Sequence, residues 1–202
     1  VNVKGLIAGG IAGKSGGSVI NCVSTVEVAA SGTNAGGIAG ILAANGLIQN
    51  CGFGGAVTSG ENAGGIAGNK EANSAIFRAF VFGNRIIAGK NAGGIAGKVD
   101  ASFYAYEDVV NCAVGSDVAV SSQSAATVTK GESVVPFFTS LGLPQTVWNL
   151  DGETPALKAE IENAPAEVKL TVGGEEISVP YGSHTQGELF TDSEPSLHFS
   201  TL

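Results

Sequence analysis

The hexapeptide AGGIAG occurs four times in this chain, and this repeat constrains the fold more than any other feature. The copies begin at Ala8, Ala35, Ala63 and Ala92, so successive starts lie 27, 28 and 29 residues apart. A repeat of nearly constant length means that each copy forms the same structural unit and packs on its neighbours. The architecture is therefore expected to be an array.

A second signature follows AGGIAG in most copies and marks the rest of the unit. It reads VINC, IQNC and VVNC, ending at Cys22, Cys51 and Cys112, while the third copy carries Arg78-Ala79 instead. Short runs rich in β-branched residues, separated by Gly, Asn and Ser, predict about three strands per repeat. The sequence thus predicts an all-β fold, a parallel β-solenoid of about four coils of 27–29 residues.

Stacked coils place equivalent side chains above one another, about 4.8 Å apart. We expect an inward aliphatic column made of Ile11, Ile38, Ile66 and Ile95. We expect a ladder of hydrogen-bonded amides made of Asn34, Asn62 and Asn91. The glycines of the motif are expected at corners that require positive φ. Glycines three residues before each AGGIAG are expected to be equivalent; they are Gly5, Gly32, Gly60 and Gly89.

Two other interpretations of these glycine-rich stretches are disfavoured. Residues 8–15, AGGIAGKS, fit a loose phosphate-binding loop, but such a loop must open a helix, and β-branched residues follow here. The other three copies lack the Lys-Ser ending. Disorder is disfavoured because 44% of the residues are hydrophobic and 14% are charged.

The composition changes along the chain and predicts two regions. Residues 1–158 are expected to form the solenoid with a closing segment, in which Phe137, Phe138 and Trp148 pack over the last coil. Residues 159–202 are expected to form a small or partial β module, with an immunoglobulin-like domain as one option. Its strands are predicted in AEVKLTV, GGEEISVPYG and LHFSTL, with a turn at Gly173-Gly174.

The charge distribution argues against nucleic acid as a partner. Residues 1–100 hold seven Lys and Arg and four Asp and Glu, giving +3, while residues 101–202 hold three and fourteen, giving −11, which reproduces the net −8. An acidic half repels phosphates. No apolar run is long enough to span a membrane. The start at Val1 and the absence of Met predict a fragment of a larger protein, which we expect to be monomeric.

The three cysteines occupy one repeat position and do not form a disulfide framework. The chain has no Cys-x-x-Cys pair, so no zinc site is expected. We interpret the cysteines as small buried hydrophobic residues, interchangeable with Ala79 of the third copy. Pairing of Cys22 with Cys51 across adjacent coils is the alternative.

The fourth copy contains the longest insertion and supplies the candidate binding residues. The interval from AGGIAG to the Asn position is 13, 15, 15 and then 19 residues. Function commonly resides in loops that interrupt a repeat. The candidate ligand contacts are Phe103, Tyr104, Tyr106, Glu107 and Asp108. The alternative, which the burial preference of aromatic residues favours, is that they and Phe77, Phe80 and Phe82 fill a wider core or an open end.

Catalysis is not expected in this chain. Glycan-cleaving β-helices need paired carboxylates on one face, and no acidic residue recurs at a repeat position. Glu107 and Asp108 are neighbours, so a strand would point them to opposite faces. His184 and His198 lie in the tail without a triad pattern. No cofactor or metal is expected.

The repeats resemble the GLUG motif of bacterial surface and secreted proteins. The resemblance rests on NAGGIAG followed by VINC, and on VWNLDGETPALK at residues 147–158, which is similar to the segment that closes such arrays. The chain departs from the motif by placing Ala at Ala12 and Ala39 instead of a larger aliphatic residue.

The resemblance implies an extracellular module at the bacterial cell surface, adhesin-like or accessory to an IgA-peptidase-type protein. Its expected role is adhesion, ligand presentation or spacing, with a host or cell-surface protein or glycan as partner. The alternative is an accessory module of a secreted peptidase or glycan-active enzyme whose catalytic domain lies outside this chain.

Overall fold

A computed structural model describes residues 2–83, 85–100, 109–121, 141–152, 154–158, 167–172 and 175–180, with the backbone alone described in the last two ranges. The chain divides into two compact units, Val1–Lys158 and Ala159–Leu202. Each unit is described by itself.

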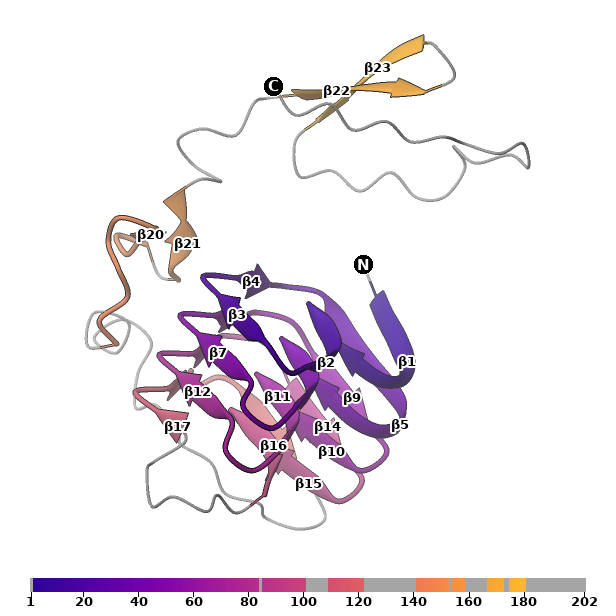
Figure 1. The fold of residues 1–202 in the computed structure, drawn as a ribbon, viewed down its shortest axis with the longest axis vertical. Coiled ribbons are helices and arrows are strands. Elements are labelled where there is room, and N and C mark those ends of the chain that lie inside the picture. The colour runs from indigo at the N-terminus through magenta and orange to yellow at the C-terminus, as the bar shows by residue number, and fades with distance from the viewer. Residues whose placement is uncertain are drawn as a thin grey trace. The chain divides into compact units, whose positions relative to one another are not determined.

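The first unit is a parallel β-solenoid of four coils, as predicted (Figure 1). Coil 1 contains β1 (Asn2–Gly9), β2 (Ala12–Ser15), β3 (Ser18–Ile20) and β4 (Val23–Ser24). Coil 2 contains β5 (Glu27–Gly36), β6 (Ala39–Leu42), β7 (Leu47–Gln49) and β8 (Gly52–Phe53). Coil 3 contains β9 (Val57–Ser59), β10 (Asn62–Gly64), β11 (Ala67–Lys70), β12 (Ala75–Phe77) and β13 (Phe80–Val81). Coil 4 contains β14 (Arg85–Ala88), β15 (Asn91–Gly93), β16 (Ala96–Val99), β17 (Val109–Val110) and β18 (Ala113–Val114), and β19 (Ala119–Ser121) follows it.

Corresponding strands of successive coils pair in parallel and form four sheets along the stack. The first sheet holds seven strands: β1, β5, β9, β10, β14, β15 and β19. The other three hold four strands each, in the orders β2-β6-β11-β16, β3-β7-β12-β17 and β4-β8-β13-β18. One AGGIAG unit therefore turns the corner between the first sheet and the second in every coil.

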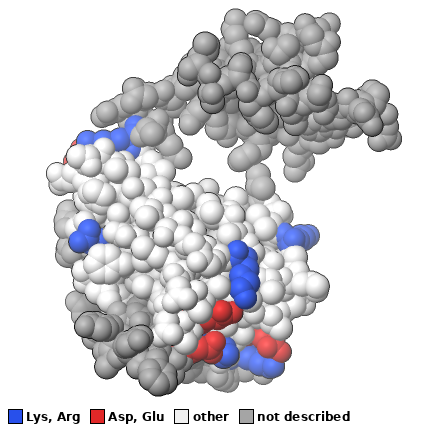
Figure 2. Space-filling model, viewed as in Figure 1, with Lys and Arg blue, Asp and Glu red and all other residues white. Residues whose placement is uncertain are grey.

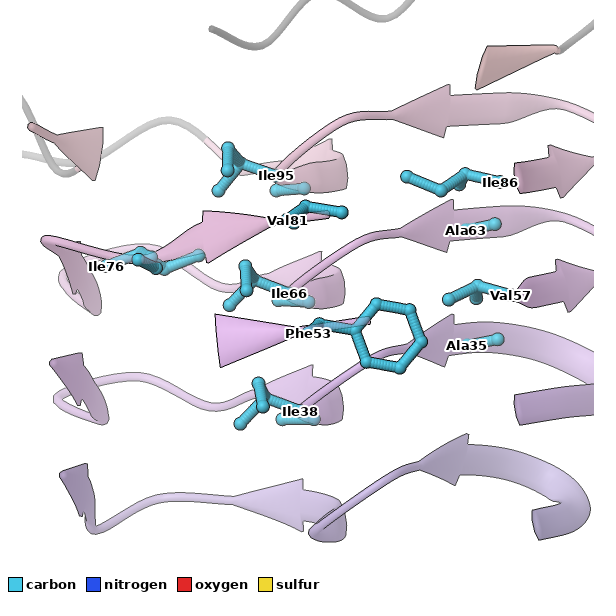
Figure 3. Packing of buried hydrophobic residues seen from close by; sticks show 14 of the residues in the cluster. Ala35, Ile38, Phe53, Val57, Ala63, Ile66, Ile76, Val81, Ile86 and Ile95 are labelled. Atoms are coloured by element: carbon cyan, nitrogen blue, oxygen red, sulfur yellow. The ribbon is translucent and has the colours of Figure 1, made fainter. Parts of the chain in front are cut away.

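The predicted isoleucine column runs through the interior (Figure 3). Ile38, Ile66 and Ile95 are each 0% exposed. The backbone amides of Ile11, Ile38 and Ile66 each donate to the carbonyl of the isoleucine in the next coil. Ile11 continues the column but is 48% exposed, because coil 1 is the end of the described stack. Burial in this column thus comes from neighbouring coils, as expected for a solenoid.

The predicted asparagine ladder is also present. Asn62 Nδ2 donates to Asn34 Oδ1 at 2.9 Å, and Asn91 Nδ2 donates to Asn62 Oδ1 at 2.7 Å. The ladder ends at coil 1, where Ile7 pairs with Asn34 and offers no amide. Asn34 Nδ2 instead donates to Thr33 Oγ1 at 2.8 Å. The side-chain amides of Asn62 and Asn91 thus donate to the neighbouring coil, and that of Asn34, at the end of the ladder, donates within its own coil.

The prediction that the motif glycines adopt positive φ is wrong. Among the described glycines, positive φ occurs at Gly142 alone, outside the repeats. The motif glycines are needed for space instead. A Cβ built on the second glycine of a motif meets the fourth sheet across the interior: it would lie 2.6 Å from Val81 at Gly65 and 2.5 Å from Val114 at Gly94. Glycine here keeps the core thin.

The left-handed corners are instead formed by the residue before the Cys position. Asn21, Asn50 and Asn111 have φ of 55°, 52° and 51°, and Arg78 has 53°. Asparagine tolerates this region better than most residues with a side chain. The Asn of the Asn-Cys signature is therefore explained by backbone geometry.

The expected equivalence of Gly5 with the later glycines is wrong. Gly5 pairs with Ala30, and the register shifts between Gly5 and Ile7. Gly32 lies over the carbonyl of Leu6, and Gly60 over that of Gly32. Between Gly5 and Ile7 the first copy has fewer residues than the second copy has between Ala30 and Asn34. The equal spacing of the glycines from AGGIAG did not reveal this difference.

Trp148 of the closing segment packs against the flank of the solenoid and not over its last coil, while Phe137 and Phe138 lie outside the described residues. β20 (Trp148–Asn149) pairs antiparallel with β21 (Ala156–Leu157). Trp148 is 1% exposed and clusters with Phe80 of coil 3 and Ala113 of coil 4. Because Phe80 and the inward-facing Val81 are neighbours on β13, they point to opposite faces of the fourth sheet. The aromatic residues therefore form a second core outside the coils.

The described part of the second unit is an antiparallel pair of strands. β22 (Glu167–Val172) pairs with β23 (Glu175–Pro180), with Val172 opposite Glu175. Two of the three predicted strands of this region are confirmed, while Gly173, Gly174 and the third predicted strand, at residues 197–202, lie outside the described residues.

Candidate functional site

The five predicted ligand contacts lie outside the described residues. Phe103, Tyr104, Tyr106, Glu107 and Asp108 all fall within 101–108, between β16 and β17. The insertion itself is consistent with the framework, because β17 stacks on β12 in register despite the longer connection: Ile76 pairs with Val109. The assignment of these residues to ligand binding stays a prediction.

The stretch that fits a phosphate-binding loop has a structural role in the solenoid. Residues 12–15 form β2 and are followed by the strand β3, not by a helix. The Lys14 ammonium forms an ion pair with Glu71 Oε1 at 3.3 Å, and Glu71 Oε2 accepts from the Ala44 amide at 3.1 Å. Glu71 of coil 3 thus links coils 1 and 2, and Lys14 is not directed at a phosphate.

Two other described carboxylates are also held by lysines on the surface. Lys90 pairs with Glu61 at 2.6 Å, and Lys98 with Asp100 at 2.8 Å. The hydrogen bond from Lys98 lowers the pKa of Asp100. Most of the described surface in Figure 2 is uncharged, and its acidic groups lie beside basic ones. Glu61, like Glu71, is thus held by a lysine of another coil, whereas Asp100 is held by a lysine of its own coil.

The corner between the third and fourth sheets carries a second amide ladder that sequence reasoning missed. Asn50 Nδ2 donates to Asn21 Oδ1 at 3.0 Å. The next coil has Arg78 at this position, and Asn50 Oδ1 and Arg78 Nε are both buried without a hydrogen-bond partner. The guanidinium of Arg78 instead lies 4.8 Å from the centroid of the Phe77 ring. Arg78 therefore interrupts the ladder in coil 3. The recurrence of Asn at this position in the other three coils was a sequence signal for the ladder.

Replacing Arg78 with asparagine is expected to raise the free energy of unfolding by about 1 kcal/mol. The new amide would donate to Asn50 Oδ1 and accommodate the left-handed backbone, which gains about 1–2 kcal/mol. Loss of the contact with Phe77 offsets this by about 0.5–1 kcal/mol. Urea unfolding measures the change, with the exposed Arg85→Asn as control. Equal or lower stability of R78N would contradict the ladder argument.

The cysteines follow the Asn corner and point into the core. Cys51 is 0% exposed, Cys112 is 4% exposed, and Ala79, which is 0% exposed, takes the same position in coil 3. Burial raises the pKa of the Cys51 thiol to about 12 and that of Cys112 to about 11. Both thiols are thus protonated at neutral pH. The interpretation of these two cysteines as buried apolar residues is confirmed.

The aromatic residues of coil 3 lie on the outer flank. The rings of Phe80 and Phe82 stack with centroids 5.9 Å apart, and Phe80 meets Trp148 edge-on at 5.5 Å. Gly52 of coil 2 leaves the space that the Phe80 ring occupies. The expectation that these rings fill the solenoid core or its end is wrong for Phe80, which is buried by the closing segment.

Lys70 is a buried charged residue that sequence reasoning also missed. It is 0% exposed, and it pairs in register with Leu42 below and Val99 above. Its charge contributes a smaller share to lowering the pKa of Asp100. The signal was available in the sequence, because the second residue after each AGGIAG is Ser15, Leu42, Lys70 and Val99.

The part of the chain that the structure describes contains neither a cluster of metal-ligand side chains nor a membrane-spanning helix. No three His, Cys, Asp or Glu side chains gather there as metal ligands would. No helix within the described residues is long and apolar enough to cross a membrane.

These features define the class of the first unit as a parallel β-solenoid with a thin, filled interior and a flanking closing segment. Among solved structures, the chain is similar to a candidate immunoglobulin A1 protease from Bacteroides ovatus, with a TM-score of 0.53 and 22% sequence identity. The match covers 70% of this chain and 57% of that one, so the chain matches little more than half of its structural neighbour's length. The likeness supports the fold.

The sequence matches no protein-family model and no curated protein. The resemblance to GLUG repeats therefore stays a prediction.

Proposed function

We propose that this chain is a non-catalytic repeat module of an exported bacterial protein, which spaces or presents a binding surface. The observation that carries the proposal is the register of the stack. Isoleucines, alanines and amides of successive coils stack in columns, so the interior is filled and the coils are held in register. A filled, in-register stack is suited to holding surface loops at fixed positions.

The surface charges support the same role. Lys14 and Glu71 link different coils, as do Lys90 and Glu61. These groups are engaged in holding coils together, and exposed pairs of this kind are typical of a structural surface. Under this proposal, the long insertion of coil 4 is the loop that meets a host or cell-surface protein or glycan.

A glycan and extracellular-matrix array tests the binding role. We expect the full chain to bind one glycan or protein class, and the double change of Tyr104 and Tyr106 to alanine to weaken that binding at least about tenfold, since truncating contact aromatics commonly costs more than 1.4 kcal/mol. Tyr181→Ala, in the second unit, is the matched control and should bind normally. Equal binding by the double variant would contradict the assignment of this loop.

A second candidate function is an accessory module of a secreted peptidase. It is favoured by the structural likeness to a candidate immunoglobulin A1 protease. We expect the chain to bind immunoglobulin A1 in biolayer interferometry, with immunoglobulin G as control, and to leave it uncut on a gel. Absence of binding would contradict the second candidate, and cleavage would contradict a non-catalytic module.

A further inference from the structure

Two cysteines lie directly over one another at the junction of coils 1 and 2. The Gly52 amide donates to the Cys22 carbonyl at 2.8 Å, and Val23 pairs with Gly52 in parallel register. Cys22 and Cys51, the preceding residues of that pair, therefore occupy equivalent positions in adjacent coils. Adjacent strands lie about 4.8 Å apart, which is within the Cα separation of disulfide-linked residues, about 4.4–6.8 Å.

The sulfur of Cys51 is directed toward coil 1. Cys51 Sγ lies 3.5 Å from the carbonyl oxygen of Val19 in coil 1 and 3.2 Å from that of Gln49 in its own coil. Cys22 Sγ lies 3.4 Å from the carbonyl oxygen of Ile20. The thiol of Cys22 also contributes to the raised pKa of Cys51, through charge and a side-chain hydrogen bond. The two thiols thus face the same space between the coils.

The two thiols differ in access to solvent. Cys22 is half-buried in the end coil, whereas Cys51 is 0% exposed. A small disulfide can reach Cys22 but not Cys51, so the exposed thiol is the one that is attacked first.

The third cysteine provides a natural comparison. Cys112 Sγ points toward coil 3 in the same way, 3.7 Å from the Ile76 carbonyl oxygen. The residue below it is Ala79, whose carbonyl accepts from the Ala113 amide. Cys112 therefore has no thiol in the adjacent described coil.

We propose that Cys22 and Cys51 are a redox-active pair that forms a disulfide linking the end coil to coil 2. Both cysteines are reduced in the structure described here. The Cys22 thiolate attacks glutathione disulfide, forming a mixed disulfide and releasing one glutathione. Cys51 then loses its proton and attacks Cys22 Sγ, releasing the second glutathione. Two thiols are oxidised and one glutathione disulfide is reduced to two glutathiones.

The bond would secure the least supported coil. Coil 1 packs on a neighbour on one side within the described stack, and its Leu6, Ile7, Ile11 and Ile20 are exposed. A covalent link to coil 2 would limit opening of this end in an oxidising compartment, where disulfides persist.

Incubating the folded, reduced full chain with glutathione disulfide at pH 8 tests the proposal. We expect the loss of two of its three thiols, measured by alkylation after unfolding. Cleavage after glutamate separates the Cys22 and Cys51 peptides at Glu27, so a linked pair of these peptides in the mass spectrum identifies the bond. Hydrogen exchange in β3 should slow in the oxidised protein.

Two variants serve as controls. Cys112→Ala should still lose two thiols, and Cys51→Ala should retain glutathione on Cys22 because no second thiol displaces it. The proposal is overturned if the native chain keeps all three thiols, if it stays glutathionylated at Cys22, or if the bond formed involves Cys112.

Discussion

Replacing Gly65 with alanine is expected to lower the free energy of unfolding of the solenoid by about 3 kcal/mol or more. The added methyl group would meet the Gly94 carbonyl oxygen of the next coil and would lie 2.6 Å from Val81 across the interior. A backbone oxygen held in a stack cannot move without shifting the whole coil. The loss of stability is therefore expected at the upper end of the range that is usual for overpacked cores. Urea unfolding followed by the fluorescence of Trp148, the single tryptophan, measures the loss.

Gly17→Ala is the matched control for this change. Gly17 lies in the corner between β2 and β3, and a Cβ there would meet no atom within 4 Å. We expect stability to be unchanged or raised by up to about 1 kcal/mol, since alanine restricts the unfolded chain. Similar losses for both variants would show that glycine is needed for flexibility, which contradicts the close-packing explanation.

Truncating Ile66 to alanine is expected to cost about 2–5 kcal/mol, the range for large-to-small changes in a rigid core. Ile66 is 0% exposed, with Ile38 below and Ile95 above, so coils on both sides prevent collapse of the cavity. The change should also raise hydrogen exchange in coils 2 to 4, because neighbouring coils are energetically coupled. Urea unfolding and hydrogen exchange measure the two effects.

Ile11→Ala tests whether position in the stack determines that cost. Ile11 occupies the same column but is 48% exposed, so its loss should cost less than about 1 kcal/mol. If Ile11 and Ile66 were equally costly to truncate, burial between coils would not explain the stability of the column.

The sequence predicted the features that depend on the repeat period. Ile38 and Ile66, or Asn34 and Asn62, stack because one coil equals one repeat, so counting residues was sufficient. It did not reveal why the glycines are there. Gly65 is needed for a close approach across the core, and a local pattern cannot distinguish this from a need for positive φ.

Features that depend on contacts between distant segments were harder to predict. Phe80 faces outward because Gly52 below it leaves space and Trp148 covers it, and these three positions are far apart in the sequence. The candidate binding loop was identified from the length of the insertion in the fourth copy. That length shows where the repeat is interrupted, but it does not indicate which ligand would bind there. Lys70 shows that a position whose residue varies between the repeats can be fully buried.

A crystal structure of the chain tests the register of the coils most directly. The Cα atoms of Ile38, Ile66 and Ile95 should lie on one line with about 4.8 Å between neighbours. Their side chains should face inward, and Asn62 should donate to Asn34 within hydrogen-bond distance. An offset of one residue between coils would turn these isoleucines toward solvent, and that result would contradict the account.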